Sequence, residues 1–225
     1  KLYAARMRLG VTTDTQDTTG SVCATRPVTC ARAGVEAVLA RFRGEIEQIP
    51  PMYSAVSVGG VRLYKLARQG VEVERAPRRV RVDSLTLGSA VGENEYELFI
   101  ECSKGLYVRT LIADIGEALG CGAAMSALRR LRAGGFSIEQ AVTLEQAAEL
   151  AEAGRLAGTA LSADFLFAGL PELRLTARGE TVIKHGAPWR TALPDGACRL
   201  YGPDGTFLGL GGVEGGLVRI KKSFY

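Results

Sequence analysis

The 225-residue sequence predicts an α+β fold, in which a mixed, mostly antiparallel sheet flanked by helices precedes a small C-terminal β-barrel. Several segments alternate apolar and polar residues, the period expected of strands with one buried face. Other segments carry apolar residues three or four positions apart, the period of helices. Beyond residue 168 glycine and proline interrupt short apolar runs, which is typical of a small all-β unit. We therefore expect one domain over 1–168 and a second over 169–225.

Residues 2–9 form the first expected strand, whose inward positions are Tyr3, Ala5, Met7 and Leu9. Because Lys1 lies at the start of this strand without an initiator methionine, we expect natural sequence ahead of it. The polar run 12–20 predicts a loop. Residues 31–44 predict a helix that ends at Gly44, with one apolar face made of Val35, Val38, Leu39 and Phe42.

The middle of the chain predicts a turn-rich segment and then two paired strands. After a Pro-Pro break and a Gly-Gly turn, a short helix carries Leu63, Leu66 and Ala67 and stops at Gly70. The runs "RRVRVDSLTL" and "ENEYELFIECS" alternate in the manner of antiparallel strands.

Two short helices are expected next. The first has the stripe Leu111, Ile112, Ile115 and Leu119 with Gly120 as its cap, and the second, in "AAMSALRRLRAGG", has the stripe Met125, Leu128 and Leu131. Thr143 and Gln146 predict a capping box before a further helix that extends to Ala153. The apolar runs expected to build the barrel lie around Leu173, Val182, Leu200, Phe207 and Val218.

Composition excludes several classes of protein. With 47% hydrophobic and 23% charged residues, the chain can bury a core, and no run approaches the roughly 18 to 20 apolar residues of a membrane span. Five scattered cysteines suggest neither a disulfide framework nor a zinc site, so we expect a reducing cytoplasm. The single histidine, His185, is expected in a surface loop. Residues 62–81 hold seven Lys/Arg against two Glu, which suits a polyanion such as RNA or a solvated face.

The segment "CSKGLYVRTLIADIGEALGCG" places Lys104, Tyr107 and Arg109 where a strand gives way to a helix. Either these side chains reach a cleft, or Tyr107 is core and Arg109 pairs with a surface glutamate. The segment lacks the G-x-x-x-x-G-K spacing of a phosphate-binding loop. Asp14 and Asp17 lack the glutamate that completes a calcium loop, so they predict an Asx-turn loop.

Four segments in order resemble the bacterial TruB-type tRNA pseudouridine synthases. They are "KLYAARMRLGVTTDTQDTTG", "IPPMYSAVSVGGVRLYKLARQG", "CSKGLYVRTLIADIGEALGCGA" and "LRRLRAGGF". The tail, from "LRLTARGETVIKHGAPW" to "GTFLGLGGVEGGLVRIKK", is similar to the PUA-type RNA-binding barrel that ends these enzymes. The resemblance identifies the expected α+β domain with a pseudouridine synthase core that is incomplete at its N-terminus.

The resemblance implies isomerisation of one uridine in the T loop of tRNA to pseudouridine, with no cofactor and no metal. Tyr3 would stack on the flipped uracil and assist proton transfer, Tyr107 and Leu128 would wall the pocket with Lys104 nearby, and Arg109 would pair with the catalytic aspartate. Expected RNA contacts are Arg62, Lys65, Arg68, Arg129, Arg130, Lys221 and Lys222. The expected partner is the T stem-loop of tRNA, with no membrane, and the expected state is a monomer.

The aspartate of the family lies in a Gly-x-Leu-Asp-Pro segment that these 225 residues do not contain. None of the aspartates present, at positions 14, 17, 83, 114, 164, 195 and 204, has that context. Asp114 is expected to be a solvent-facing helix residue. The chain alone is therefore expected to be inactive, and the alternative is a non-catalytic RNA-binding module that uses the same pocket and barrel.

Overall fold

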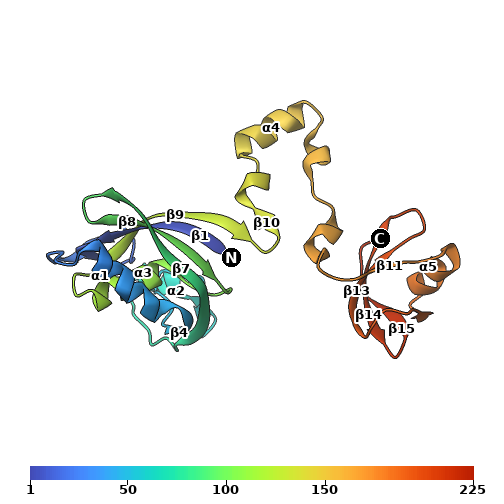
Figure 1. Cartoon of the computed structure of the whole chain (residues 1–225), viewed down its shortest axis with the longest axis horizontal. Coiled ribbons are helices and arrows are strands. Elements are labelled where there is room, and N and C mark those ends of the chain that lie inside the picture. The colour runs from blue at the N-terminus through green and yellow to red at the C-terminus, as the bar shows by residue number, and fades with distance from the viewer. The chain divides into compact units, whose positions relative to one another are not determined.

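The computed structural model describes all residues from Lys1 to Tyr225, and the chain divides into two compact units. The first spans Lys1–Gln140 and the second Ala141–Tyr225; Figure 1 shows the elements of each. None of the helices is long and apolar enough to cross a membrane.

A six-stranded antiparallel sheet forms the frame of the first unit, in the order β10-β9-β1-β8-β7-β4 (Figure 1). The strands are β1 (Leu2–Leu9), β4 (Gly44–Gln48), β7 (Arg78–Gly92), β8 (Glu95–Cys102), β9 (Ala123–Ala133) and β10 (Phe136–Ser137). The alternation expected over residues 2–9 is confirmed, because Tyr3, Ala5, Met7 and Leu9 are all buried. The expected antiparallel pairing of the two runs that follow the turn-rich segment is also confirmed, as β7 with β8.

Two helices pack on the buried face of this sheet. They are α1 (Arg32–Leu39), which continues as a 3₁₀ turn over Ala40–Phe42, and α3 (Val108–Ala118). Their apolar faces join the buried face of the strands in one core, which includes Val35, Leu39, Leu111, Ile112 and Ile115. Both helices were expected from their apolar spacing.

The prediction of a second short helix, in "AAMSALRRLRAGG", is wrong, because residues 123–133 form strand β9. Leu128 pairs with Ala5 and Met125 with Met7, positions two apart on β1, so one extra residue of β9 bulges between them. A second register shift lies near Tyr3. Each bulge puts residues three apart on one face of the strand, which imitates a helical spacing.

Two smaller hairpins leave the main sheet. Strands β2 (Val11–Thr13) and β3 (Val22–Thr25) flank the polar loop expected over 12–20. Strands β5 (Ser57–Val58) and β6 (Val61–Arg62) meet at the expected Gly-Gly turn and lead into the expected short helix α2 (Leu63–Ala67).

The second unit begins with helical segments. Helix α4 (Leu144–Glu152) has the predicted capping box, since Thr143 and Gln146 exchange side-chain and backbone hydrogen bonds. Two 3₁₀ segments follow it, Leu156–Thr159 and Ala163–Phe167. A further 3₁₀ segment, Ile138–Gln140, precedes α4 and belongs to the first unit. The compact units separate after Gln140, whereas the domain boundary between 168 and 169 stays a prediction.

A five-stranded sheet of order β11-β13-β14-β15-β12 completes the second unit. Its strands are β11 (Glu172–Arg174), β12 (Trp189–Arg190), β13 (Gly196–Tyr201), β14 (Phe207–Glu214) and β15 (Leu217–Ser223). Val182, expected in the barrel's strands, lies instead in helix α5 (Ala177–Lys184), whose buried residue Ile183 joins the core of this sheet. His185 is exposed, as expected, but it caps this helix.

Candidate functional site

A cavity of about 290 Å³ lies in the first unit, where β1 and β9 meet the first turn of α3. It brings together residues that are far apart in the sequence and come from β1, β9, the first turn of α3 and the loop ahead of that helix. Its lining is Tyr3, Leu106, Tyr107, Val108, Arg109, Met125, Leu128 and Arg130. Four of the expected site residues and one expected RNA contact therefore share one cavity.

Tyr3 lies inside the sheet with only 6% of its surface exposed. On β9 its register partner is Arg130, and the guanidinium carbon of that arginine lies 5.4 Å from the centroid of the Tyr3 ring. This is a cation–π geometry. A base that stacks on this face of Tyr3 must displace the guanidinium.

Leu128 is 47% exposed although it is apolar, because it lines the cavity instead of packing in the core. Its neighbour Arg129 pairs in register with Ala4 and belongs to the other face of the strand. Arg129 lines a second hollow together with Arg6, which Leu128 also borders. Arg129 and Arg130, which are both expected RNA contacts, therefore line different hollows.

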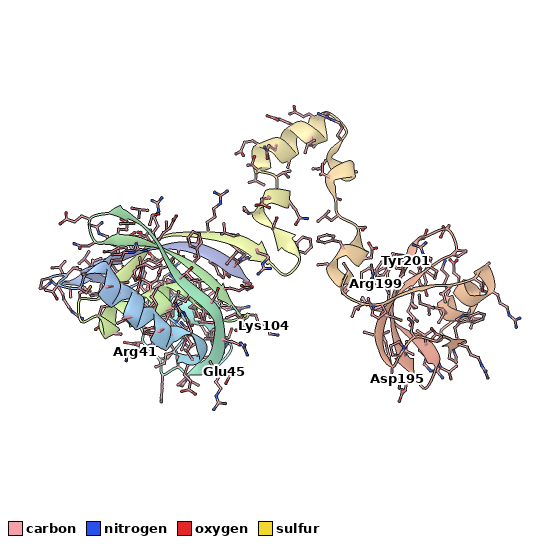
Figure 2. All side chains as sticks on the ribbon, in the orientation of Figure 1. Arg41, Glu45, Lys104, Asp195, Arg199 and Tyr201 are labelled. Carbon is pink, nitrogen blue, oxygen red and sulfur yellow. The ribbon has the colours of Figure 1, made fainter.

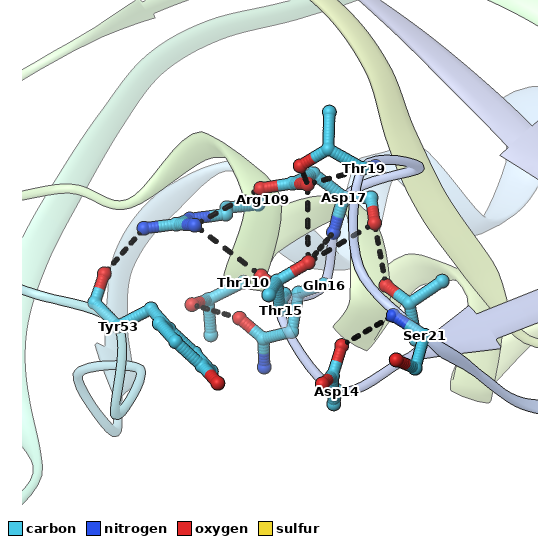
Figure 3. A network of polar contacts seen from close by, with 10 residues as sticks. Asp14, Thr15, Gln16, Asp17, Thr19, Ser21, Tyr53, Arg109 and Thr110 are labelled. Atoms are coloured by element: carbon cyan, nitrogen blue, oxygen red, sulfur yellow. Dashed lines mark hydrogen bonds and ion pairs between the residues drawn. The ribbon is translucent and has the colours of Figure 1, made fainter. Parts of the chain in front are cut away.

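Arg109 is the second residue of α3, and its guanidinium joins three segments (Figure 3). Its Nη1 donates to the Asp17 carboxylate at 3.0 Å, and its Nη2 donates to the carbonyl oxygen of Tyr53 at 2.6 Å. A longer contact of 3.4 Å joins Nη1 to the carbonyl oxygen of Thr15. The side chains of Arg109 and Asp17 are 22% and 15% exposed, so this ion pair is largely shielded from water.

The partner of Arg109 within this chain is thus neither the expected absent aspartate nor a surface glutamate. Sequence reasoning set Asp17 aside as a turn residue, and the Asx-turn interpretation is confirmed, because its Oδ1 accepts from the Thr19 N–H at 3.1 Å. The sequence did not predict that Asp17 also pairs with Arg109. The one indication in the sequence was that Asp17 lies in the first of the segments that carry the family resemblance.

The Asp17 carboxylate accepts four hydrogen bonds, three at Oδ1 and one at Oδ2. Partial burial by itself would raise the pKa of Asp17, but hydrogen bonds from Thr19, Thr15 and Arg109 lower that pKa below its ordinary value of 3.8. Its Oδ1 accepts from both threonines and its Oδ2 from Arg109 (Figure 3). A carboxylate held by three donors at one oxygen and by a guanidinium at the other suits an anchor better than a nucleophile.

The loop that carries Asp17 is tied to the rest of the site on both sides. The hydroxyl of Thr110, which is 4% exposed, donates to the side-chain oxygen of Gln16 at 2.8 Å. On the other side the backbone of Met125 on β9 donates to Gln16 O at 3.0 Å and accepts from Thr18 N at 2.9 Å. These bonds fix the loop against α3 and β9, and so they fix the position of Asp17.

The other expected contact residues lie outside this cavity. Lys104 is exposed in the loop after β8 (Figure 2). Three basic residues follow the β5–β6 turn and are exposed: Arg62, Lys65 and Arg68. In the second unit Lys221 and Lys222 are exposed on β15, and Lys221 lines a surface hollow with Arg219.

Asp114 departs from its expected solvent-facing position. It is partly buried on α3, and burial together with the nearby charge of Glu117 raises its pKa to about 6.

No cluster of three or more His, Cys, Asp or Glu side chains forms a ligand set for a metal. The chemistry that the cavity offers is therefore an aromatic face, apolar walls and two guanidinium groups.

Comparison with known proteins covers almost the whole chain. Residues 1–108 match the N-terminal domain of the TruB family pseudouridylate synthases, and residues 109–163 match the tRNA pseudouridylate synthase B C-terminal domain. The tRNA pseudouridine synthase B of Azoarcus sp. (strain BH72) is 44% identical over 223 residues, which are 99% of this chain and 73% of that protein. The protein of the same name from Pseudomonas syringae pv. syringae (strain B728a) is 44% identical over 220 residues, which are 95% of this chain and 71% of that protein.

Solved structures support the fold. A Cbf5-Nop10-Gar1 complex contains a chain that this one matches with a TM-score of 0.68 at 22% identity, over 100% of this chain and 66% of that one. An H/ACA RNP bound to a substrate RNA containing 2'-deoxyuridine gives a TM-score of 0.67 at 20% identity, again over 66% of the solved chain. The two matched domains and the 44% identity show that this chain belongs to the TruB family of pseudouridylate synthases, whose relatives named here are tRNA pseudouridine synthases.

Proposed function

We propose that this chain binds one flipped uridine of the tRNA T loop and forms the walls of the pocket in which that uridine becomes pseudouridine. The supporting observation is the cavity that collects Tyr3, Tyr107, Leu128 and Arg109. Unstacking a base costs a few kcal/mol, and stacking on an aromatic side chain returns about 1–3 kcal/mol. Tyr3 is the proposed platform, and the guanidinium of Arg130 leaves its ring when the base arrives.

In the proposed reaction the bond between N1 of uracil and C1′ of the ribose breaks, and the uracil turns. A bond then forms between C5 and C1′, the proton leaves C5, and N1 ends with a proton. The product is an isomer of the substrate, so the reaction consumes no second reactant.

Arg109 is the proposed support of the nucleophile. Its contacts to Asp17, Thr15 and Tyr53 use three of the five N–H donors of a guanidinium, which leaves two. Two donors can hold a second carboxylate by a charge-assisted pair of hydrogen bonds. The proposed occupant is the aspartate of a Gly-x-Leu-Asp-Pro segment, which these 225 residues do not contain.

A second candidate is a non-catalytic RNA-binding module that uses the same pocket and barrel, since the cavity and the exposed basic residues could serve binding without chemistry. The genomic sequence ahead of Lys1 separates the two candidates. An in-frame Gly-x-Leu-Asp-Pro supports the enzyme, and a start codon at or near residue 1 supports the binding module.

Two measurements on the 225-residue chain test the proposal. A T stem-loop labelled with tritium at C5 of uridine should release no tritium, because the nucleophile is missing. The same RNA should still bind, and its affinity should fall by about 0.7–0.9 log units per log unit of salt for each phosphate neutralised. Tritium release above background, or an affinity that salt does not change, would contradict the proposal. The T-loop target, the monomeric state and the cytoplasmic location remain predictions.

A further inference from the structure

Gln48, the last residue of β4, is only 2% exposed and bonds both backbone polar atoms of Tyr107. Its side-chain oxygen accepts from the Tyr107 N–H at 3.0 Å, and its side-chain nitrogen donates to the Tyr107 carbonyl oxygen at 3.3 Å. The carboxamide thus pairs with this one residue in the way that a neighbouring strand would, across 59 positions of sequence.

These two hydrogen bonds matter because helix α3 starts from Tyr107. It is the N-cap residue, and its side chain makes no capping hydrogen bond. Tyrosine is a poor N-cap, since preferred caps carry a short side chain that accepts from the first helical turn. The Tyr107 carbonyl also accepts from Leu111 N at 3.0 Å, so Gln48 holds the residue from which the helix starts.

The same short segment also reaches Arg109. Five residues after Gln48, the carbonyl oxygen of Tyr53 accepts from the Arg109 guanidinium. Between them Pro50 and Pro51 are both buried, and their fixed φ angles restrict the segment. Residues 48–53 therefore hold the aromatic wall and the guanidinium of the cavity at the same time.

We propose that Gln48 is a positioning residue of the uridine pocket, which acts by fixing the backbone of Tyr107 and, two residues later, the start of the Arg109 side chain. It does not touch the base. This inference rests on the proposed function, because it requires a uridine to enter the cavity.

Two substitutions separate positioning from mere space filling. Gln48→Met keeps the length of the side chain and removes both hydrogen bonds. The carboxyl introduced by Gln48→Glu cannot donate when it is ionised, but when protonated it accepts through its carbonyl and donates through its O–H, which restores both bonds. A side chain that only fills space would give no such recovery at low pH.

The surroundings allow this pH test. Charged residues near Gln48 are Glu47 on its own strand, Arg78 opposite it on β7, and Arg75, whose guanidinium donates to the Pro50 carbonyl oxygen at 3.3 Å. Arg109 follows Tyr107 by two positions on α3. Because position 48 is only 2% exposed, burial raises the pKa of the carboxyl introduced by Gln48→Glu above its ordinary value, into the range between about pH 5 and about pH 8. Asp114, further along α3, titrates at about 6, so each variant is compared with the unsubstituted chain at the same pH.

The experiment uses the 225-residue chain and a T stem-loop RNA with 5-fluorouridine at the target position, observed by fluorine NMR. The unsubstituted chain should give a separate resonance for fluorine inside the pocket. Gln48→Met should lower the pocket-bound fraction about tenfold, the effect of two lost hydrogen bonds. Total RNA affinity should change less than about threefold, because phosphate contacts dominate it. At about pH 8 the ionised carboxyl of Gln48→Glu faces the Tyr107 carbonyl oxygen without a proton to donate, so the pocket-bound fraction should fall below that of the unsubstituted chain. At about pH 5 it should recover towards the unsubstituted chain.

Gln146→Met is the matched control, since Gln146 also accepts from a backbone N–H, that of Thr143 at 2.9 Å, but in the second unit. It should leave the pocket-bound fraction unchanged. If the unsubstituted chain gives no pocket resonance, the proposed function fails and this inference fails with it. If that resonance is present and Gln48→Met keeps it, the inference alone is overturned. A Gln48→Glu chain whose pocket-bound fraction is the same at about pH 5 and about pH 8, whether or not the chain is folded, also overturns the inference.

Discussion

Tyr3, Tyr107, Leu128 and Arg109 were expected in one pocket only through the family resemblance, and the structure does place all four around one cavity. The Asp17 partner of Arg109 was missed for a physical reason. The two residues lie 92 positions apart, and the bonds that hold the Asp17 loop run from α3 and from β9. No local pattern encodes such contacts, because they depend on how strands and helix pack.

Arg109→Lys tests how much the hydrogen bonds from Arg109 to Asp17 and to the Tyr53 carbonyl oxygen stabilise the fold. One ammonium group cannot reproduce the planar fork that bonds both Asp17 and the Tyr53 carbonyl, so the free energy of unfolding should fall by about 1–2 kcal/mol. Affinity for a T stem-loop should change by less than about 1 kcal/mol. Urea unfolding followed by circular dichroism and an RNA titration measure the two quantities. Arg174→Lys, at an exposed ion pair with Glu172, is the control and should stay within about 0.5 kcal/mol.

The opposite pattern would change the role of Arg109. A variant as stable as the unsubstituted chain that binds RNA about tenfold more weakly, which is about 1.4 kcal/mol, would make this arginine a phosphate contact. In a protein that also carries the Gly-x-Leu-Asp-Pro segment, Arg109→Lys should lower turnover with little change in RNA affinity, because the planar guanidinium positions the nucleophile.

Asp114 gives a prediction with a definite pH dependence. Burial and Glu117 raise its folded pKa to about 6 from an ordinary 3.8, so the folded state binds its proton more tightly than the unfolded state does. Stability should therefore fall as pH rises from about 4 to about 6, and partial exposure limits the loss to about 1–2 kcal/mol. Asp114→Asn should be more stable than the unsubstituted chain by that amount at pH 7 and equal to it near pH 4. Urea unfolding at both pH values measures this, and a less stable Asp114→Asn at pH 7 would contradict it.

At the scale of elements, alternation and helical spacing predicted most of the first unit correctly, because they record which face of each element is buried. Strand β1, helix α1 and the pairing of β7 with β8 follow that rule. Residues 123–133 do not, since bulges in β9 interrupt the two-residue period and leave Met125 and Leu128 at a helix-like spacing. Pairing with β1 decides the structure of this segment, and a local pattern contains no record of that pairing.

The packing of α3 on β9 depends on Gly116. A Cβ atom at this buried position would lie 2.1 Å from Ala123 N and 2.4 Å from Gly122 C, both backbone atoms that cannot move aside cheaply. Gly116→Ala should lower the free energy of unfolding by about 3 kcal/mol or more. Gly120→Ala is the control, because Gly120 has a positive φ of 81° but open space around it, and it should cost only about 1–2 kcal/mol. Equal losses for the two variants in urea unfolding would contradict the close packing.

At the scale of the whole molecule, the sequence predicted two parts and a change of texture between them. The compact units separate after Gln140, and the helical residues up to Phe167 group with the second unit by their contacts. The change to short apolar runs interrupted by glycine and proline marks where strands of a new sheet begin, here at Glu172. It does not reveal where the contacts of the first sheet end. The expected basic RNA contacts occur in both units, whereas the cavity belongs to the first alone.

The most direct test of the account is a double-mutant cycle between Tyr3→Ala and the target base. Dissociation constants are measured for the 225-residue chain and for Tyr3→Ala, each with a T stem-loop that has either the target uridine or an abasic nucleotide in its place. If the uracil stacks on Tyr3, the two changes should be coupled by about 1–3 kcal/mol. A coupling energy of zero, with Tyr3→Ala weakening both RNAs equally, would show that no base reaches the Tyr3 ring and would contradict the proposed uridine pocket.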